Sequence, residues 1–155
     1  MQGILKHSDA IKFILAGNST VTFLNTKTQK RFTYRIKLKE NGPHFVKVLT
    51  NPDVYQFIGS IFNQNFKHSQ KSKIGDDAQS VKVFQYVFNK LKEGTLDPCI
   101  EIWHEGRCGR CNRPLTVPES IETGIGPECL KMMSGHKSII RQAKIDKILK
   151  SVQDN

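Results

Sequence analysis

The chain has 155 residues and a formal net charge of +10 at pH 7, and its 37% hydrophobic and 25% charged residues are ordinary for a folded protein. This length suits one compact domain, or a larger module with a small appendage. No apolar run approaches the ~18–20 residues of a membrane-spanning helix and no secretory signal is recognisable, which excludes a membrane partner and predicts a cytoplasmic protein with reduced cysteines.

The first part of the chain predicts short antiparallel strands. Gly17 and Asn18 form a strong turn signal between two short apolar or alternating runs. Residues 31–38 alternate apolar with polar side chains, as in a strand with one buried face. This pattern predicts a meander or a small open barrel. Strands are expected over residues 11–16, 20–25, 31–38 and 45–49, whereas residues 53–61 are compatible with a strand or a helix.

A basic, polar segment without periodicity follows over residues 66–73 and predicts a loop. A helix is expected after it, capped by Asp76 or Asp77 and ending at Gly94, with apolar positions at helical spacing that should pack on the sheet. Residues 99–103 predict a further strand.

The positive charge is concentrated in the first part of the chain. Residues 1–98 contain 15 Lys or Arg against 7 Asp or Glu, and residues 99–155 contain 9 against 7. The basic face of strand 31–38 would present cations about 7 Å apart, roughly the separation of successive phosphates. We therefore expect this module to contact DNA or RNA. The predicted contacts are Arg31, Arg35 and Lys37 of that strand, with Lys67, Lys71 and Lys73 of the loop.

Two other interpretations of the basic face remain open. The face could be merely solvated, or it could meet an acidic protein surface, so that the chain acts as an inhibitor or adaptor on a host complex. Exposed aromatic residues would favour a single-strand groove. Most aromatic residues look like core residues, and Tyr55, Tyr86 and Trp103 are the candidates for exposure.

Residues 104–129 contain three of the four cysteines and one of the five histidines, spaced His-x3-Cys-x2-Cys-x17-Cys. A closed zinc site needs four N or S donors, and a Cys-x2-Cys turn delivers two thiolates to one ion. A redox dithiol is disfavoured because Pro114 follows the motif too soon for a long helix, and a disulfide because no secretory signal is present. The predicted ligands of a structural Zn²⁺ are His104, Cys108, Cys111 and Cys129.

The fourth ligand is the least determined, and Cys99 and His136 are the alternatives to His104. Between the ligands, a capping box at Thr116 and a return turn at Gly124 predict a short helix over residues 117–123. Cys129 would then lie in the first turn of the next helix, where the helix dipole favours a thiolate. This arrangement is that of a zinc knuckle followed by a ligand-bearing helix, in the manner of a treble clef.

The pattern CxxCxRxLTxPxSI followed by GIGPxC, from Cys108 to Cys129, resembles a small zinc-finger family of uncharacterised function that is frequent in bacteriophage and mobile-element proteins. The stretches ILAGNSTVTF, KRFTYRIK and WHEGRC are similar to longer phage proteins of that family. Asn112 departs from the family pattern, in which glycine is more usual after the second cysteine. The resemblance implies zinc and a phage setting, and it implies no activity.

An enzyme is not expected. The His-Glu pair at residues 104–105 superficially resembles that of zinc deaminases, but four protein ligands would leave no open coordination position. The sequence thus predicts an α+β protein with two modules: an antiparallel β module with a packed helix over residues 1–98, and a zinc-knuckle module over residues 99–155, packed as one unit. The second module would end in an amphipathic helix over residues 138–152.

Overall fold

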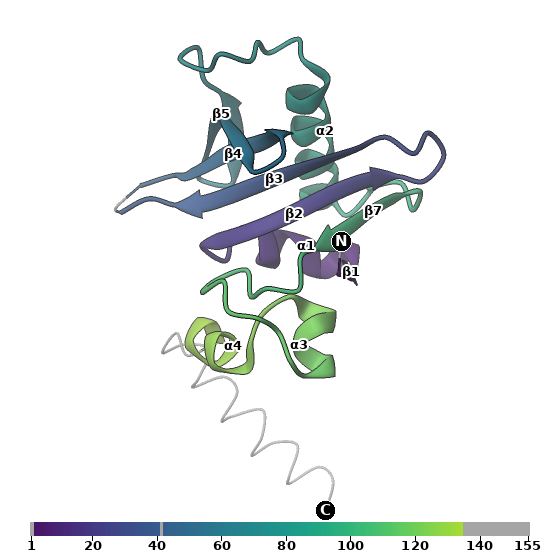
Figure 1. Ribbon diagram of the computed structural model, residues 1–155, viewed down its shortest axis with the longest axis vertical. Helices are drawn as coiled ribbons and strands as arrows, with labels where there is room; N and C mark the ends of the chain where they lie inside the picture. Colours follow the sequence, from purple (N-terminus) through teal and green to yellow (C-terminus); the bar gives the residue numbers. More distant parts are fainter. Residues whose placement is uncertain (1, 41, 135–155) are drawn as a thin grey trace, which may run out of the picture.

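The computed structural model describes residues 2–40 and 42–134. Within this part of the chain, seven antiparallel strands form one sheet in the order β1-β7-β2-β3-β4-β5-β6, with helices beside it (Figure 1). The chain is therefore an α+β protein, as predicted. The strands are β1 (Gly3–Leu5), β2 (Asn18–Asn25), β3 (Arg31–Leu38), β4 (His44–Asn51), β5 (Val54–Phe62), β6 (Asn65–His68) and β7 (Ile100–His104), and the helices are α1 (His7–Ile14), α2 (Gln79–Glu93), α3 (Pro118–Thr123) and α4 (Pro127–Ser134).

Strands β2, β3 and β4 confirm three of the predicted strands, and the ambiguous run over residues 53–61 lies mostly in β5. In β3 the alternation separates two environments: Tyr34 and Ile36 are fully buried, whereas Arg35 and Lys37 are exposed. A strand places successive side chains on opposite faces, so one face of the sheet is apolar and the other is cationic.

The strand predicted over residues 11–16 is wrong, because residues 11–14 belong to helix α1 and residues 15–16 to the turn that follows it. Its buried residues are Ala10, Phe13 and Ile14, which follow the spacing of a helix rather than that of a strand. The hydroxyl of Ser19 at the start of β2 donates to the carbonyl of Ile14 at 2.9 Å and satisfies one of the free acceptors at the helix end.

The predicted loop over residues 66–73 is wrong in its first part, because β6 includes residues 66–68. Phe66 is buried, and its ring centroid lies 4.8 Å from that of Phe84 in α2, so packing against the helix holds this segment to the sheet. Helix α2 starts after Ala78 without a side-chain cap, so neither predicted aspartate caps it. It ends at Gly94 as predicted, with a left-handed φ of 73° that glycine adopts without strain.

Helices α1 and α2 lie on one side of the sheet and cover its apolar face (Figure 1). The core between these layers is rich in aromatic rings: Tyr34 packs edge-on against Phe84 at 4.9 Å, and its hydroxyl donates to the carbonyl of Ser80 at 2.6 Å. Burial raises the pKa of Tyr34 well above its usual value. The opposite side of the sheet is not covered by these helices.

Strand β7, which connects the first part of the chain to the part with the cysteines, is itself a strand of the sheet. Strand β7 lies between β1 and β2, pairing antiparallel with both, and β1 was not predicted. After β7 the chain forms residues 105–134, which contain α3 and α4 and which we call the cysteine-bearing segment (Figure 1). The helix predicted over residues 138–152 lies outside the described residues. Within the described ranges, no helix is long and apolar enough to cross a membrane.

Candidate functional site

Three of the four predicted metal ligands come together in the structure. The Sγ atoms of Cys108, Cys111 and Cys129 all lie within 4.8 Å of one another, and we call these residues the cysteine cluster. Cys108 and Cys129 are buried, and Cys111 is exposed. Three thiol groups this close together could coordinate one metal ion.

The first two cysteines are brought together by a tight turn. The Cys108 N–H donates to the Arg113 carbonyl at 2.8 Å, and the Asn112 N–H donates back to the Cys108 carbonyl at 2.9 Å. Asn112 has a left-handed φ of 66°, a conformation that asparagine tolerates better than most residues other than glycine. Asparagine at this position is therefore compatible with the tight turn. The Arg110 N–H points at the Cys108 sulfur at 3.4 Å.

Cys129 reaches the cluster through the return turn expected from the sequence. Helix α3 ends at Gly124, whose φ of 75° is left-handed, and α4 begins at Pro127. Cys129 is therefore in the first turn of α4, as predicted. The N-terminus of α3 differs from the prediction, because Val117 is its capping residue and no side chain, including that of Thr116, caps it.

The surroundings of the sulfurs affect their protonation in opposite directions. Burial raises the pKa of the Cys129 thiol to about 11, although the Arg110 guanidinium, which donates to this sulfur at 3.7 Å, opposes the shift. Burial would also raise the pKa of Cys108, but hydrogen bonds from the backbone N–H groups of Cys111, Gly126 and Arg110 bring it below its usual value. These hydrogen bonds therefore stabilise the thiolate form of Cys108, which is the form that binds metals.

His104, the preferred fourth ligand, does not join the cluster in this structure. Its side chain is buried, its Nε2 lies 2.6 Å from the Ile121 carbonyl, and the Gly106 N–H donates to its Nδ1 at 2.9 Å. This geometry requires a neutral ring with the proton on Nε2, and it occupies both ring nitrogens. Burial lowers the pKa of His104 and favours the same neutral form.

The two alternative ligands are also not in the cluster. Cys99 directly precedes β7, whereas His104 is the last residue of this strand, so the two residues lie at opposite ends of β7. The Cys99 carbonyl accepts a hydrogen bond from the Thr26 hydroxyl at 2.9 Å. His136 lies outside the described residues. Within residues 2–40 and 42–134, the cluster therefore consists of three cysteines and no fourth His, Cys, Asp or Glu.

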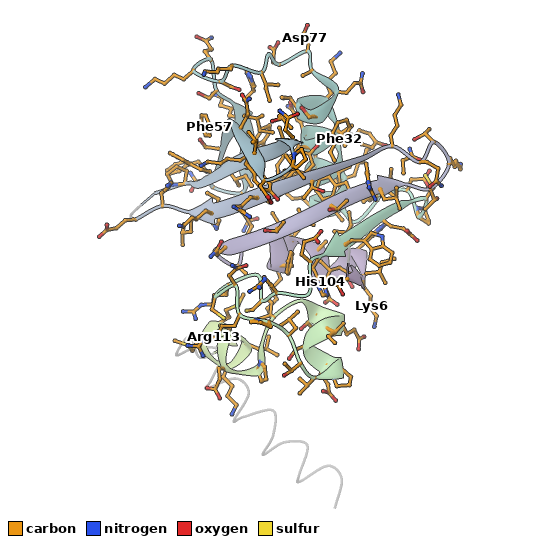
Figure 2. The ribbon with its side chains drawn as sticks, viewed as in Figure 1. Lys6, Phe32, Phe57, Asp77, His104 and Arg113 are labelled. Carbon is orange, nitrogen blue, oxygen red and sulfur yellow. The ribbon has the colours of Figure 1, made fainter. Side chains whose placement is uncertain are left out.

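A backbone hydrogen bond attaches the cysteine-bearing segment to the sheet, because the Asn18 N–H at the start of β2 donates to the Gly109 carbonyl at 2.7 Å. Within the segment, the Gly109 N–H donates to the Gly124 carbonyl at 2.8 Å. Outside these bonds, Lys6 and Glu122 form an exposed ion pair at 3.0 Å. Figure 2 shows Lys6 and His104 between the sheet and the segment that carries Arg113. The turn that holds two of the cysteines is thus tied to the start of β2.

The predicted cations mostly gather on the uncovered side of the sheet, which we call the open face. The strand register places Arg35 directly opposite Lys47, a residue that the sequence analysis did not single out. Lys71 and Lys73 are exposed in the loop between β6 and α2, beyond the strands. Glu105, directly after β7, accepts a hydrogen bond from the Thr22 hydroxyl on this face. The register assigns to the open face Arg31, Thr33, Arg35, Lys37, Phe45, Lys47, Leu49, Tyr55, Phe57, Phe62, Lys67, Glu101 and Trp103.

Aromatic residues lie among these cations. The Arg35 guanidinium carbon is 4.2 Å from the centroid of the Tyr55 ring, and the rings of Phe45 and Phe57 are 5.2 Å apart. Burial raises the pKa of Tyr55, and the nearby Arg35 partly offsets the shift. The alternation of β4 already indicated that Phe45 faces away from the buried valines. Phe57 could not be placed in this way, because the β4–β5 pairing has a register shift that interrupts the alternation.

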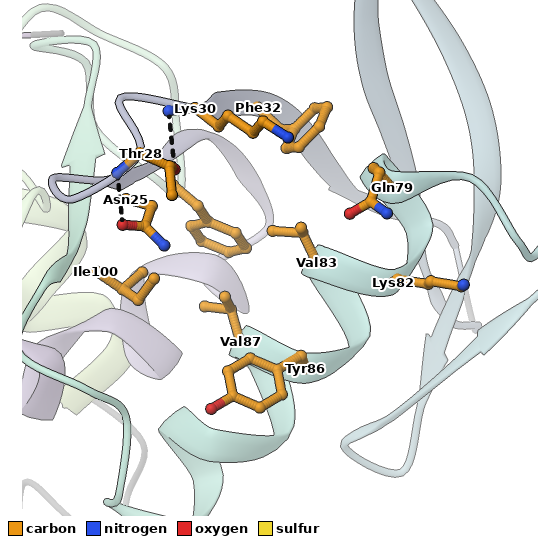
Figure 3. A pocket seen from close by; sticks show the side chains of 11 residues that line it. Asn25, Thr28, Lys30, Phe32, Gln79, Lys82, Val83, Tyr86, Val87 and Ile100 are labelled. Carbon is orange, nitrogen blue, oxygen red and sulfur yellow. Dashed lines mark hydrogen bonds between the residues drawn. The ribbon is translucent and has the colours of Figure 1, made fainter.

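A cavity of about 350 Å³ lies on the other side, between α2 and the turn that joins β2 to β3 (Figure 3). The polar side chains that line it form hydrogen bonds within the turn. The Asn25 Oδ1 accepts hydrogen bonds from the backbone N–H groups of Lys27 and Thr28, and the Thr28 hydroxyl accepts one from the backbone N–H of Lys30. Tyr86, the third aromatic residue expected at the surface, is 53% exposed at this cavity rather than on the open face.

Residues 103–134 match the model of a protein family described as "Family of unknown function (DUF6011)". The match covers the end of β7 and the whole cysteine-bearing segment, and it leaves out the rest of the sheet. It agrees with the resemblance to an uncharacterised family noted for Cys108 to Cys129. Comparisons with curated proteins and with solved structures found no match.

Proposed function

We propose that the chain binds nucleic acid through the open face, and that the cysteine cluster holds a structural Zn²⁺. The proposal of nucleic-acid binding rests on the position of Arg35 directly opposite Lys47 on the neighbouring strand. Like charges directly opposite one another in a sheet are destabilising, and a polyanion laid across both strands would relieve the repulsion. Phosphates of DNA or RNA are such a polyanion.

The distribution of charge supports this role. Five cations of the sheet strands lie on the open face, and the ion pairs Lys6–Glu122 and Lys90–Glu93 lie elsewhere. Of the acidic residues of the face, Glu101 is on β7, two strands away from β3, and Glu105 directly follows β7 and acts on Tyr55, whose pKa it helps to raise. The cationic area is therefore centred on β3 and β4, where phosphates would be bound. These five cations are Arg31, Arg35, Lys37, Lys47 and Lys67.

Zinc is the metal that this donor set favours. Thiolate ligands select zinc over magnesium or calcium, and a tight cysteine turn followed by a helix carrying the third cysteine is the arrangement of a treble clef. A metal bound between Cys108 and Cys129 would crosslink the turn to α4. We assign this ion a stabilising role, with no catalytic step, in a cytoplasmic protein of a phage or mobile element.

A protein partner is the second candidate. Val117, the residue that precedes α3, and Ile121 within α3 are 37% and 39% exposed. Exposed apolar residues of this kind fit a host protein as partner, on which the chain would act as an inhibitor or adaptor. This alternative places the contact on the cysteine-bearing segment rather than on the open face.

The two candidates differ in their dependence on salt. We would measure the Kd of the zinc-loaded protein for labelled single- and double-stranded DNA and RNA at about 50 and 200 mM salt. We expect the Kd to rise with salt, and Arg35→Ala with Lys47→Ala to weaken binding and flatten the salt dependence. Lys82→Ala, an exposed lysine on α2, is the matched control. Absence of binding at low salt would exclude the nucleic-acid role and leave the protein partner.

A further inference from the structure

We infer that the ligand of the open face is a single strand whose bases stack on a row of aromatic side chains. This inference rests on the proposed function and specifies the form of the nucleic acid. The aromatic row consists of Tyr55, Phe57 and Phe62 of β5 and Phe45 of the neighbouring β4.

The row has the spacing of an extended nucleic-acid strand. Tyr55 and Phe57 are two residues apart on one strand, which places their side chains about 6.8 Å apart on the same face. A bulge follows, in which Ile58 is buried, and the alternation resumes so that Phe62 also belongs to the open face. Several aromatic rings can therefore contact successive bases of one strand.

Three of the four rings of the row lie close to a cation. Arg35 covers the Tyr55 ring, Lys47 is paired with Phe57, and the Lys39 ammonium is 5.2 Å from the centroid of the Phe45 ring. A nucleotide is complementary to such a pair, because its flat base can stack on the ring and its phosphate can contact the cation. Cations interleaved with aromatic rings are the combination that binds single strands with little sequence preference.

A duplex would not use these rings. Its bases are stacked on one another, so their flat faces are closed to a side chain, and an intact duplex offers phosphates and groove edges instead. Phe62 is 61% exposed, a large apolar surface without a covering partner among the described residues. Unpaired bases would cover it, whereas phosphates alone would not.

The area that the bound single strand can cover is limited on one side by β7. Trp103 lies on the open face, and its Nε1 donates to the Glu101 carboxylate at 3.1 Å, so the surface near this ring is acidic. Phosphates are repelled there, and the strand is expected to follow β3, β4 and β5.

The test compares single strands with duplexes of the same sequence, as DNA and as RNA, by the fluorescence anisotropy of labelled oligonucleotides. We expect the single strands to bind at least about tenfold more tightly than the duplexes, and Phe62→Leu and Tyr55→Leu each to weaken single-strand binding by roughly five- to tenfold or more. Their salt dependence should match that of the unaltered protein, because no cation is removed. A tighter affinity for RNA than for DNA of the same sequence would indicate a contact with the 2′-hydroxyl.

Tyr86→Leu is the matched control, since Tyr86 is 53% exposed and has the Lys90 ammonium 5.9 Å from its ring, but lies on α2. Its affinity should stay within about twofold of the unaltered protein. Phe62→Leu tests the idea even if Tyr55→Leu impairs folding, because Phe62 is largely exposed. Duplex binding as tight as single-strand binding, or a Phe62→Leu variant of full affinity, would overturn the stacking inference and leave the proposed function intact. Absence of all binding would instead overturn the proposed function.

Discussion

The ring of Phe13 in α1 lies directly against Gly124, so close that a Cβ added to this glycine would be 2.5 Å from the Phe13 Cδ1. The same ring approaches Gly109, between the first two cysteines, where an added Cβ would be 2.8 Å from Cδ1. One core aromatic residue therefore contacts both halves of the cysteine-bearing segment. Two positions without side chains allow this close packing.

Gly124→Ala should be strongly destabilising. Alanine in the left-handed region costs about 1–2 kcal/mol, and the clash with Phe13 adds about 1–3 kcal/mol of overpacking. We expect the free energy of unfolding, measured with denaturant, to fall by the sum of these terms. Gly94→Ala is the control, because Gly94 has a similar φ of 73° and no atom within 4 Å of the added Cβ. Equal losses in the two variants would show that the Phe13 contact contributes nothing.

Cys129→Ser should remove the bound metal. We expect metal analysis to fall from about one equivalent of zinc to almost none, and the melting temperature to fall by about 10 °C or more, because metal binding contributes directly to folding. Cys99→Ser is the matched control, since this cysteine is only partly exposed and lies outside the cluster. A Cys129→Ser variant with unchanged zinc content would contradict the metal site.

His104→Gln distinguishes the structural geometry from the ligand set expected from the sequence. Both ring nitrogens of His104 contact the main chain, so this substitution should leave the zinc content at about one equivalent. Glutamine retains one donor and one acceptor, which limits the loss of stability. Loss of zinc in a variant that is still folded would show instead that His104 turns towards the cluster when metal binds.

The stability of the protein should also depend on the protonation of His104. Burial lowers its pKa in the folded chain below the ordinary value of 6.5. Below pH 6.5 the unfolded chain takes up a proton that the folded chain excludes, so the free energy of unfolding falls as the pH falls towards the folded pKa. Above pH 6.5 both states are neutral, and this contribution does not change.

Denaturant unfolding between pH 7.5 and 5.5 would measure this effect, with His104→Gln as the reference. We expect the unaltered protein to lose more stability than the variant over this range, by at most about 1.4 kcal/mol per pH unit. Parallel curves for the two proteins would show that His104 is not held neutral.

Elements with a clear local pattern could be predicted from the sequence. The alternation of residues 31–38 identified β3 with its bounds, and Gly94 identified the end of α2. The segment over residues 11–16 could not be assigned locally, because a short apolar run is compatible with either period and its helix begins earlier, at His7. Strand β1 has three residues and exists only because β7 supplies a partner from late in the chain.

The candidate site shows the same division. The spacing of the three cysteines sufficed to predict that their sulfurs meet, whereas the role of His104 depends on the Ile121 carbonyl, 17 residues later, which spacing alone does not bring into view. Lys47 was missed as a partner of Arg35, because opposition across two strands depends on their register. The prediction that phosphates bind here stays a prediction.

The position of β7 has a consequence for how the protein is synthesised. Residues 100–104 separate β1 from β2, so the sheet cannot be completed until most of the chain has left the ribosome. Before that point β2 has an unpaired edge and β1 lacks its partner, and an open edge invites pairing with another chain. A fragment that ends at residue 98 should for the same reason aggregate rather than fold, even though it would contain most of the cationic surface.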